Sequence, residues 1–230
     1  MSKDTEYLKS LMKKYKSDKA DHGKSYHLFY DKELQDIRFK INRVLEIGLS
    51  LFKNYKTKSN DITHNVDTSL KIWLDYFPNC SCVGLDKNDY SFIDNPRIKV
   101  HRLDQSNLEH LKKFRENEIK SEPFDLIIDD GSHISHHQQL TLEFLFPLLR
   151  PGGFYFIEDL NLTFSHDNIL TSIRTVDLLK KWQKGEWTNP SMFMNPINFK
   201  YLKDNIAEIR FNTDKGLERN RLALIRKKIK

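Results

Sequence analysis

The sequence is poor in cysteine and lacks any long apolar run. Its 230 residues include only Cys80 and Cys82, which stand one residue apart. That spacing excludes a disulfide framework and is typical of a protein in a reducing cytoplasm. No stretch of about 18 apolar residues occurs, so we expect no membrane span. The N-terminus has no apolar centre of the kind that a secretory signal needs.

A basic surface for nucleic acid is also missing. The formal net charge is +6, but the last twelve residues, 219–230, contain six Lys or Arg and no acid, and the remainder is neutral. The excess therefore belongs to the C-terminal end, and we expect a solvated tail, with a weak polyanion contact as the alternative. No zinc-finger spacing or RNA-binding aromatic motif is present, so nucleic acid is not an expected partner.

Apolar segments alternate with helical patterns along most of the chain. Helices are expected over 5–16, from Leu28 to about Leu34, and over 69–77, 107–115, 137–149 and around "VDLLKKWQK". Strands are expected over 43–50, 79–86, 97–104, 124–130 and 153–159. Such alternation predicts a Rossmann-like, doubly wound α/β fold with a mostly parallel sheet. Segments 206–213 and 221–228 should add a C-terminal antiparallel hairpin, and "TNPSMFMNPIN" is expected to be a loop.

Acidic residues stand at or just after the end of every expected parallel strand. They are Glu46, Asp86, Asp104, the pair Asp129 and Asp130, and the pair Glu158 and Asp159. Because the carboxyl ends of parallel strands lie along one edge of the sheet, these side chains should gather where such folds bind ligands. Clustered carboxylates repel one another, so that edge should bind hydroxyls, amines or a cation.

The pattern near the first strand favours a nucleoside that carries positive charge. Asp86 suits the two ribose hydroxyls of a nucleoside, with a helix N-cap as the structural alternative. A dinucleotide would need a glycine-rich loop, but "EIGLSLFKN" has a single glycine, and Glu46 would repel a pyrophosphate. S-adenosylmethionine, whose reactive centre is a sulfonium cation, fits this arrangement better than NAD.

These residues resemble those of class I S-adenosylmethionine-dependent methyltransferases. More narrowly, "VLEIGLS", "VGLDKN", "LDQSN", "FDLIIDDGSHISHHQ" and "LFPLLRPGGFYFIEDL" are similar to the metal-dependent macrocin- and mycinamicin-type sugar O-methyltransferases and the cephalosporin-hydroxylase-like proteins. "SDKADHGKSYHLFYD" resembles the N-terminal motif of that group loosely. We accordingly divide the chain into an N-terminal helical segment, 1–40, and a methyltransferase domain, 41–230.

The resemblance implies a role for individual residues on the cofactor side. Glu46 and Gly48 match positions beside the methionine part of the cofactor, Asp86 matches the ribose acid, and Asp104 with Gln105 matches the adenine side. Ser50, Ser69 and Asp129 complete the expected cofactor contacts, although Asp129 could instead belong to the metal shell and could equally be a buried structural acid. The sequence departs from the family at the stretch 52–66, which separates "EIG" from the next helix, and its role is open.

The second acidic group predicts a metal site. Asp130, Glu158 and Asp159 offer three carboxylates, a ligand set that suits Mg²⁺ rather than zinc, and the resemblance places Mg²⁺ on these positions. It also makes His133, acting with the metal ligand Asp130, the catalytic base that takes a proton from the acceptor hydroxyl; a capping or surface histidine is the alternative. His136 and His137 could contact substrate, and a histidine metal site is the less favoured interpretation.

Together these features predict an S-adenosylmethionine- and Mg²⁺-dependent O-methyltransferase acting on a sugar hydroxyl. The expected acceptor is a nucleotide-linked sugar or a precursor of capsule or lipopolysaccharide, and the expected location is the cytoplasm. Family members form oligomers through N-terminal segments, so a homo-oligomer is considered. The alternatives are a catechol-like phenol O-methyltransferase and a non-catalytic cofactor-binding partner protein. Trp182, Trp187, Phe193 and Phe199 could line an acceptor pocket or pack in the core.

Overall fold

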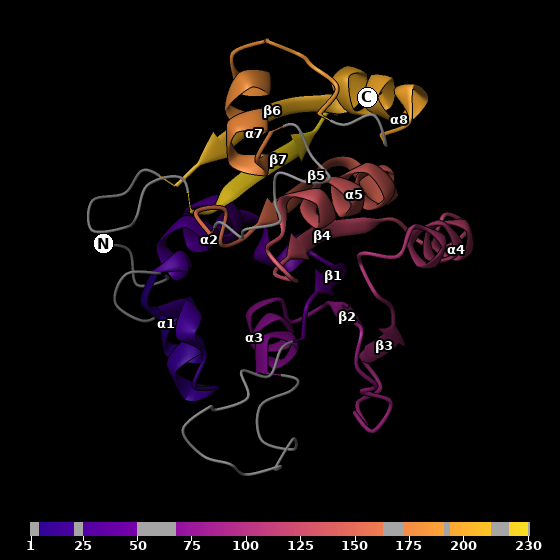
Figure 1. Cartoon of the computed structure of the whole chain (residues 1–230). Helices are drawn as coiled ribbons and strands as arrows, with labels where there is room; N and C mark the ends of the chain where they lie inside the picture. The colour runs from indigo at the N-terminus through magenta and orange to yellow at the C-terminus, as the bar shows by residue number, and fades with distance from the viewer. Residues whose placement is uncertain are drawn as a thin grey trace.

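The fold is built on one seven-stranded sheet. A computed structural model describes residues 5–20, 25–49, 68–162, 173–190, 194–212 and 221–229. The strand order is β3-β2-β1-β4-β5-β7-β6 (Figure 1). β1 pairs in parallel with β2 and β4, β2 with β3, and β4 with β5, whereas β7 runs antiparallel to both β5 and β6. The strands are β1 Arg43–Ile47, β2 Ser81–Asp86, β3 Ile98–Arg102, β4 Phe124–Asp129, β5 Leu149–Ile157, β6 Ile206–Phe211 and β7 Ala223–Lys227.

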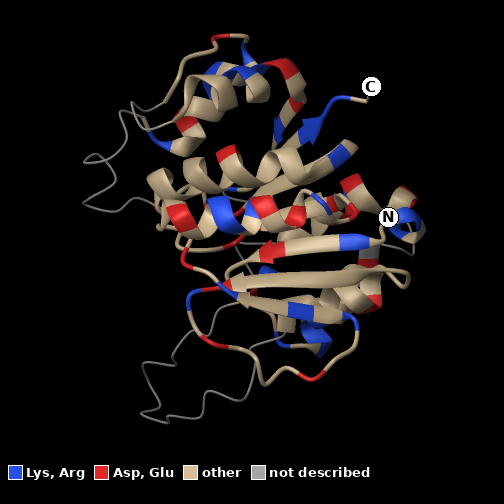
Figure 2. Cartoon of the chain, turned by 90° about the vertical axis from the view of Figure 1, so that its right-hand side faces the viewer, with Lys and Arg blue, Asp and Glu red and all other residues tan. Residues whose placement is uncertain are grey.

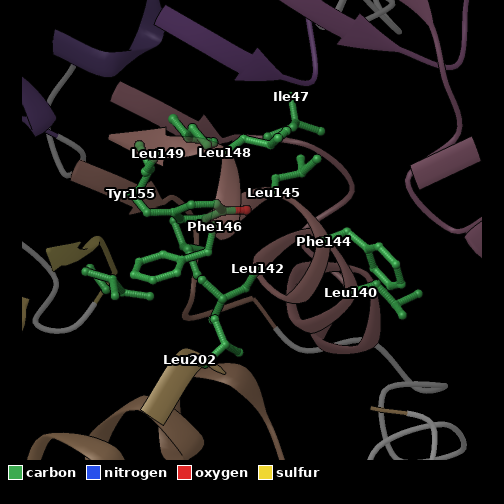
Figure 3. Packing of buried hydrophobic residues seen from close by; sticks show 14 of the residues in the cluster. Ile47, Leu140, Leu142, Phe144, Leu145, Phe146, Leu148, Leu149, Tyr155 and Leu202 are labelled. Carbon is green, nitrogen blue, oxygen red and sulfur yellow. The ribbon is translucent and has the colours of Figure 1, made fainter. Parts of the chain in front are cut away.

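Helices cover both faces of this sheet and enclose two apolar cores. On one face the core includes side chains of α1 Thr5–Lys14, α2 Tyr26–Leu34 and α3 Thr68–Tyr76. On the other face it includes side chains of α4 Leu108–Glu118, α5 Ser135–Leu145, α7 Thr175–Gln183 and α8 Pro196–Asn205. Short 3₁₀ turns, η1 Asp18–Ala20, η2 Gln35–Lys40 and η3 Phe146–Leu148, complete the described elements. Figure 3 shows part of the second core, where Tyr155 of β5 lies among side chains of α5 and η3.

The two faces are separated by residue parity along the central strands. Successive side chains of a strand point to opposite faces. Leu126 and Ile128 of β4 therefore lie in the core with α1, α2 and α3, while Ile127 lies in the core with α5. The same alternation in β1 and β5 places Val44, Phe154 and Phe156 in the first of these cores. This parity also determines which acids at the strand ends can meet.

The expected fold class is confirmed, down to the antiparallel strands at the C-terminal end. Pro147 ends the regular part of α5 at Leu145, as a proline at that place predicts. The helix α8 was not predicted, because the turn-rich "TNPSMFMNPIN" was expected to be a loop throughout. Pro196 in fact occupies the first turn of this helix, where its missing N–H costs nothing, and the Asn195 side chain accepts a hydrogen bond from the Ile197 N–H.

The basic C-terminal end is not a solvated tail. Residues 223–227 form β7 inside the sheet, and blue segments on this last strand are visible in Figure 2. Lys227 is 7% exposed and donates to the backbone oxygens of Pro147 and Leu149 at 3.0 and 2.6 Å. The expectation of a free basic tail was wrong for the described part of this end, because Arg221, Arg226 and Lys227 bind groups within the fold. No helix in the described part of the chain is long and apolar enough to cross a membrane.

Candidate active site at the carboxyl edge of the sheet

Glu46 at the end of β1 is fully buried and lies beside α3. Its Oε2 accepts a hydrogen bond from the Trp73 indole N–H at 3.2 Å, and the Ser69 side chain is also hydrogen-bonded to this carboxylate. Burial raises the pKa of Glu46 to about 7, and the positive charge of Lys19 offsets part of this increase. The structure thus brings two predicted cofactor residues, Glu46 and Ser69, together. Ser50 and the stretch 52–66 lie outside the described residues.

Gly48 allows the chain after β1 to pass against the loop after β4. Its φ is +84°, and a Cβ built there would lie 2.2 Å from the backbone oxygen of Asp130. Only glycine fits this approach without strain. The next residue, Leu49, donates its backbone N–H to Oδ2 of Asp86 at 2.9 Å, and Oδ1 of Asp86 accepts from the Asn88 N–H. Asp86 caps a turn rather than a helix, and it ties the ends of β1 and β2 together.

Asp104 and Gln105, the two residues predicted to lie on the adenine side of the cofactor, follow β3. Asp104 is partly exposed, and its Oδ1 accepts from the Ser106 backbone N–H and hydroxyl. The side chain of Gln105 is buried, and its Oε1 accepts from the Ser132 N–H at 2.6 Å. A Cβ at Gly131 would lie 2.0 Å from that same oxygen, so the glycine makes this contact feasible. Gln105 Nε2 is buried and has no hydrogen-bond partner among the described residues, which leaves one donor for a ligand.

Asp129 does not join the other acids. Its side chain lies on the α5 face, where Oδ2 accepts from the Thr141 hydroxyl and Oδ1 from the Gly131 N–H at 3.4 Å. Burial raises the pKa of Asp129 to about 6. These contacts support the structural alternative for this residue over a direct role with the cofactor. Strand parity is the reason, since odd-numbered positions of β4 face α5.

Three acids of the opposite parity surround the ammonium group of Lys19. This lysine, in η1 between α1 and α2, places Nζ 2.6 Å from Asp130 Oδ2, 2.6 Å from Glu158 Oε1 and 4.0 Å from Glu46 Oε1. The lysine is 3% exposed and Glu158 is fully buried. Burial lowers the pKa of Lys19, but the three carboxylates outweigh burial and raise it well above its ordinary value. Burial and the neighbouring Asp130 raise the pKa of Glu158 to about 8.

Asp159 and His133 lie at the outer side of this cluster in strained backbone conformations. Their φ angles are +53° and +61°, in the left-handed region that non-glycine residues rarely adopt and that often marks functional sites. His133 Nε2 is 3.8 Å from Asp159 Oδ2, and His133 Nδ1 has no hydrogen-bond partner among the described residues. Asp159 Oδ1 accepts from the Tyr26 hydroxyl and, at 2.9 Å, from Arg221 Nε.

The arrangement fits a divalent cation. Among the described residues, ligand atoms of Asp130, His133 and Asp159 lie within 4.8 Å of one another, so this group includes His133 and not the predicted ligand Glu158. Glu158 Oε2, which is buried beside them, has no hydrogen-bond partner among the described residues. Four carboxylates share the cluster with two cationic side chains, so two formal negative charges remain when all four carboxylates are ionised. The residues concerned are Glu46, Asp130, Glu158 and Asp159, with Lys19 and Arg221. Carboxylate oxygens are the ligands that Mg²⁺ prefers.

The neighbouring histidines lie outside the acidic cluster. His137 Nδ1 is 2.7 Å from the Ser132 hydroxyl, and the His136 ring lies 6.0 Å from the His137 ring. Burial lowers the pKa of His136, so it favours the neutral form. Neither histidine is part of the group that could hold a metal among the described residues.

The C-terminal aromatic residues pack with one another in the second core. Trp182 is 2% exposed, and its ring lies 5.0 Å from that of Trp187 and 6.0 Å from that of Phe199. Core packing therefore accounts for these three side chains. Phe193 lies outside the described residues.

Four site residues were missed in the sequence, namely Lys19, Tyr26, Tyr30 and Arg221. Three of them belong to "SDKADHGKSYHLFYD", the stretch that loosely resembles the family's N-terminal motif, so a signal existed. Arg221 stands in the basic C-terminal run, where nothing distinguishes it from its neighbours. A lysine or tyrosine more than a hundred residues from the acids cannot be assigned to them by spacing.

Comparison with known proteins identifies the type of fold and then its relatives. No model of a known protein family matches the sequence. The structure superposes on that of the MycE methyltransferase from the mycinamycin biosynthetic pathway in complex with Mg and SAH, with a TM-score of 0.72 and 28% identity. The match covers 96% of this chain and 54% of that one. The chain has the class I methyltransferase fold.

Curated relatives show which type of methyltransferase the sequence is similar to. The sequence is 38% identical over 131 residues to the mycinamicin VI 2''-O-methyltransferase of Micromonospora griseorubida, covering 57% of this chain and 30% of that protein. It is 35% identical to the demethylmacrocin O-methyltransferase of Streptomyces fradiae, over 59% of this chain and 32% of that protein. The chain is a homologue of the mycinamicin- and macrocin-type sugar O-methyltransferases. It spans about a third of the length of these relatives.

Proposed function

We propose that this chain catalyses transfer of a methyl group from S-adenosylmethionine to a sugar hydroxyl, with the help of Mg²⁺. The observation that carries the proposal is the group formed by Asp130, His133 and Asp159 at the carboxyl edge of the sheet. Metal-assisted deprotonation of a hydroxyl requires hard carboxylate ligands and a base. Asp130 and Asp159 offer the carboxylates, and His133 Nδ1 has no hydrogen-bond partner among the described residues. The close approach of Gly48, a proposed cofactor residue, to the backbone of Asp130 supports a cofactor site next to this group.

The cofactor would be held by residues at the ends of β1, β2 and β3. Glu46 and the backbone turn at Gly48 face the amino-acid part of the cofactor, and Asp86 accepts hydrogen bonds from the ribose. Each oxygen of Asp86 accepts one backbone N–H, which fixes the carboxylate and still leaves lone pairs for hydroxyl donors. Asp104 and Gln105 would lie on the adenine side, and Gln105 Nε2 offers a donor that no described residue accepts.

Mg²⁺ would be held by Asp130, Glu158 and Asp159. When bound, the ion polarises the acceptor hydroxyl and lowers its pKa. The residues themselves position the reacting groups: the carboxylates hold the acceptor in place, and His133 takes the proton of its hydroxyl. The hydroxyl oxygen then attacks the methyl carbon, the bond from carbon to sulfur breaks, and S-adenosylhomocysteine leaves. Positioning and charge stabilisation supply most of the rate enhancement in such a site.

The acceptor is proposed to be the sugar of a glycosylated small molecule. The relatives named above methylate, by their names, the macrolides mycinamicin VI and demethylmacrocin. A tetracenomycin-C rhamnoside 3'-O-methyltransferase of Streptomyces olivaceus is 34% identical over 153 residues, covering 66% of this chain and 36% of that protein. None of these names points to a nucleotide-linked sugar or a surface polysaccharide, so that narrower expectation has no support beyond the sequence argument. A homo-oligomer and a cytoplasmic location stay predictions.

The test combines binding with methyl transfer. Calorimetry should show that the wild type binds S-adenosylmethionine and Mg²⁺, and that Asp130→Asn keeps the cofactor but loses most of its affinity for the metal. Labelled S-adenosylmethionine is then offered with glycosylated macrolides, nucleotide sugars and a catechol. Label on a glycoside supports the proposal, and label on the catechol alone favours the phenol alternative. Cofactor binding without Mg²⁺ affinity or methyl transfer to any acceptor would indicate a non-catalytic protein.

A further inference from the structure

The N-terminal segment contributes a buried cation to the acidic cluster. Lys19 follows α1 in a single 3₁₀ turn, and its Nζ lies between Asp130 Oδ2 and Glu158 Oε1 at 2.6 Å from each. The lysine is 3% exposed, so its charge is not screened by water. An ammonium group in such a place is stable only because the carboxylates around it compensate for its lost hydration.

Two tyrosines of α2 act on the same carboxylates. The Tyr30 hydroxyl donates to Glu158 Oε1 at 2.6 Å, the oxygen that Lys19 also contacts. The Tyr26 hydroxyl donates to Asp159 Oδ1, which also accepts from Arg221 Nε. Both tyrosines are fully buried. One oxygen of each proposed metal ligand is therefore fixed by a donor from residues 19–30.

The second oxygen of these ligands is directed elsewhere. Glu158 Oε2 is buried without a hydrogen-bond partner among the described residues, and Asp159 Oδ2 faces His133 at 3.8 Å. A donor that fixes one oxygen of a carboxylate also fixes the direction of the other. Such outer contacts orient metal ligands, and their loss typically lowers metal affinity by 10- to 100-fold.

We propose that Lys19 is a positioning residue of the metal site, and that Tyr26 and Tyr30 assist it. This inference rests on the proposed function, since it concerns the same Mg²⁺. Lys19 holds Asp130 and Glu158 at a fixed separation and relieves the repulsion between them. It leaves the outer oxygens for the divalent ion, whose positive charge stabilises the ionised form of these carboxylates. The rival role is competition, in which the ammonium group occupies the place of the metal.

The experiment is calorimetric titration of Mg²⁺, and of Mn²⁺ as a second probe, into the cofactor-bound protein. Lys19→Met keeps an unbranched apolar stem of similar length but removes the charge and the donors. We expect Mg²⁺ to bind about 10- to 100-fold more weakly than to the wild type. Lys14→Met is the matched control, because Lys14 pairs with Asp75 at 2.8 Å on the exposed side of α1. Its Mg²⁺ affinity should not change.

Tyr30→Phe and Tyr26→Phe keep the test decisive if Lys19→Met does not fold. Each removes one hydroxyl and preserves the ring, and each should weaken Mg²⁺ binding. Tyr90→Phe is their control, since Tyr90 is a buried tyrosine whose hydroxyl accepts from Asn88 Nδ2 and which lies near Asp86 rather than beside a proposed metal ligand. Thermal unfolding of each variant with and without Mg²⁺ gives an independent readout.

The outcomes separate this inference from the proposed function. Tighter Mg²⁺ binding by Lys19→Met would show competition and overturn the positioning role. Unchanged Mg²⁺ affinity in Lys19→Met would also overturn the positioning role, because a residue that only supports the fold does not change the dissociation constant for the metal. If Lys19→Met does not fold, unchanged affinity in both tyrosine variants would overturn it in the same way. If the wild type itself binds no Mg²⁺, the proposed metal mechanism fails first, and the role of Lys19 fails with it.

Discussion

Replacing Gly48 with alanine should damage the metal site through the backbone. The alanine Cβ would lie 2.2 Å from the backbone oxygen of Asp130, so the chain after β4 must move by about 1 Å to reach an ordinary contact distance. The φ of +84° adds left-handed strain of about 1–2 kcal/mol. Overpacking against a fixed backbone costs a further ~1–3 kcal/mol. We therefore expect Gly48→Ala to lose about 2–5 kcal/mol of unfolding free energy in urea.

Gly185→Ala is the matched control for this prediction. Gly185 follows α7 with the same φ of +84°, but a Cβ there would meet nothing within 4 Å. It should lose only the strain, about 1–2 kcal/mol, and bind Mg²⁺ normally. Gly48→Ala should in addition bind Mg²⁺ at least about tenfold more weakly, because Asp130 carries a proposed ligand. Equal stability losses in the two variants, with unchanged Mg²⁺ affinity, would refute the claim that Gly48 is required for close approach.

Three further predictions concern the proposed base, a buried acid and removal of the metal. His133→Gln should lower the rate of methyl transfer by about 10²–10⁴-fold in single-turnover assays at saturating Mg²⁺, since the proposed base is lost; a rate near that of the wild type would exclude the base role. Burial raises the pKa of Asp129 from 3.8 to about 6, so the folded state binds more protons than the unfolded state between these values and stability falls as pH rises through them. The fall is ~3 kcal/mol. Asp129→Asn cannot titrate. In urea unfolding, its stability relative to that of the wild type should therefore rise by ~3 kcal/mol from about pH 4 to about pH 8. The surface variant Glu109→Gln should show no such rise. EDTA should abolish methyl transfer without releasing S-adenosylmethionine, and added Mg²⁺ should restore it; full activity in EDTA would contradict a metal mechanism.

The sequence predicted the sheet and the positions of its acids because both depend on local patterns. Apolar runs that end in acids identify β1, β2, β4 and β5 and their carboxyl ends, and the order of elements then predicts a parallel sheet. Strand parity could have separated Asp129 from Asp130 as well, since adjacent residues of β4 face opposite sides. Helix α8 was missed because turn-forming residues at its start hid the pattern that follows them.

The cationic half of the site could not be predicted in the same way. Lys19 and Glu158 are 139 residues apart, and Tyr26 and Asp159 are separated by 133. Contacts over such distances depend on how α1 and α2 cover the sheet, which no local pattern determines. The basic residues near the C-terminus are a different case: their composition suggested a solvated tail, but the strand pattern of 221–228 correctly predicted a strand, which pairs with β5 and β6.

The position of Lys19 has a consequence for how the chain can be divided. The boundary placed at residue 40 would leave the whole sheet in the larger fragment, with every proposed metal ligand on it. A fragment that begins at residue 41 would nevertheless expose Glu158 and Phe156 where Tyr30 now covers them, and it would have no cation between its acids. Residues 1–40 therefore cannot be treated as a separate unit, because they complete both the proposed metal site and the apolar core on that face of the sheet.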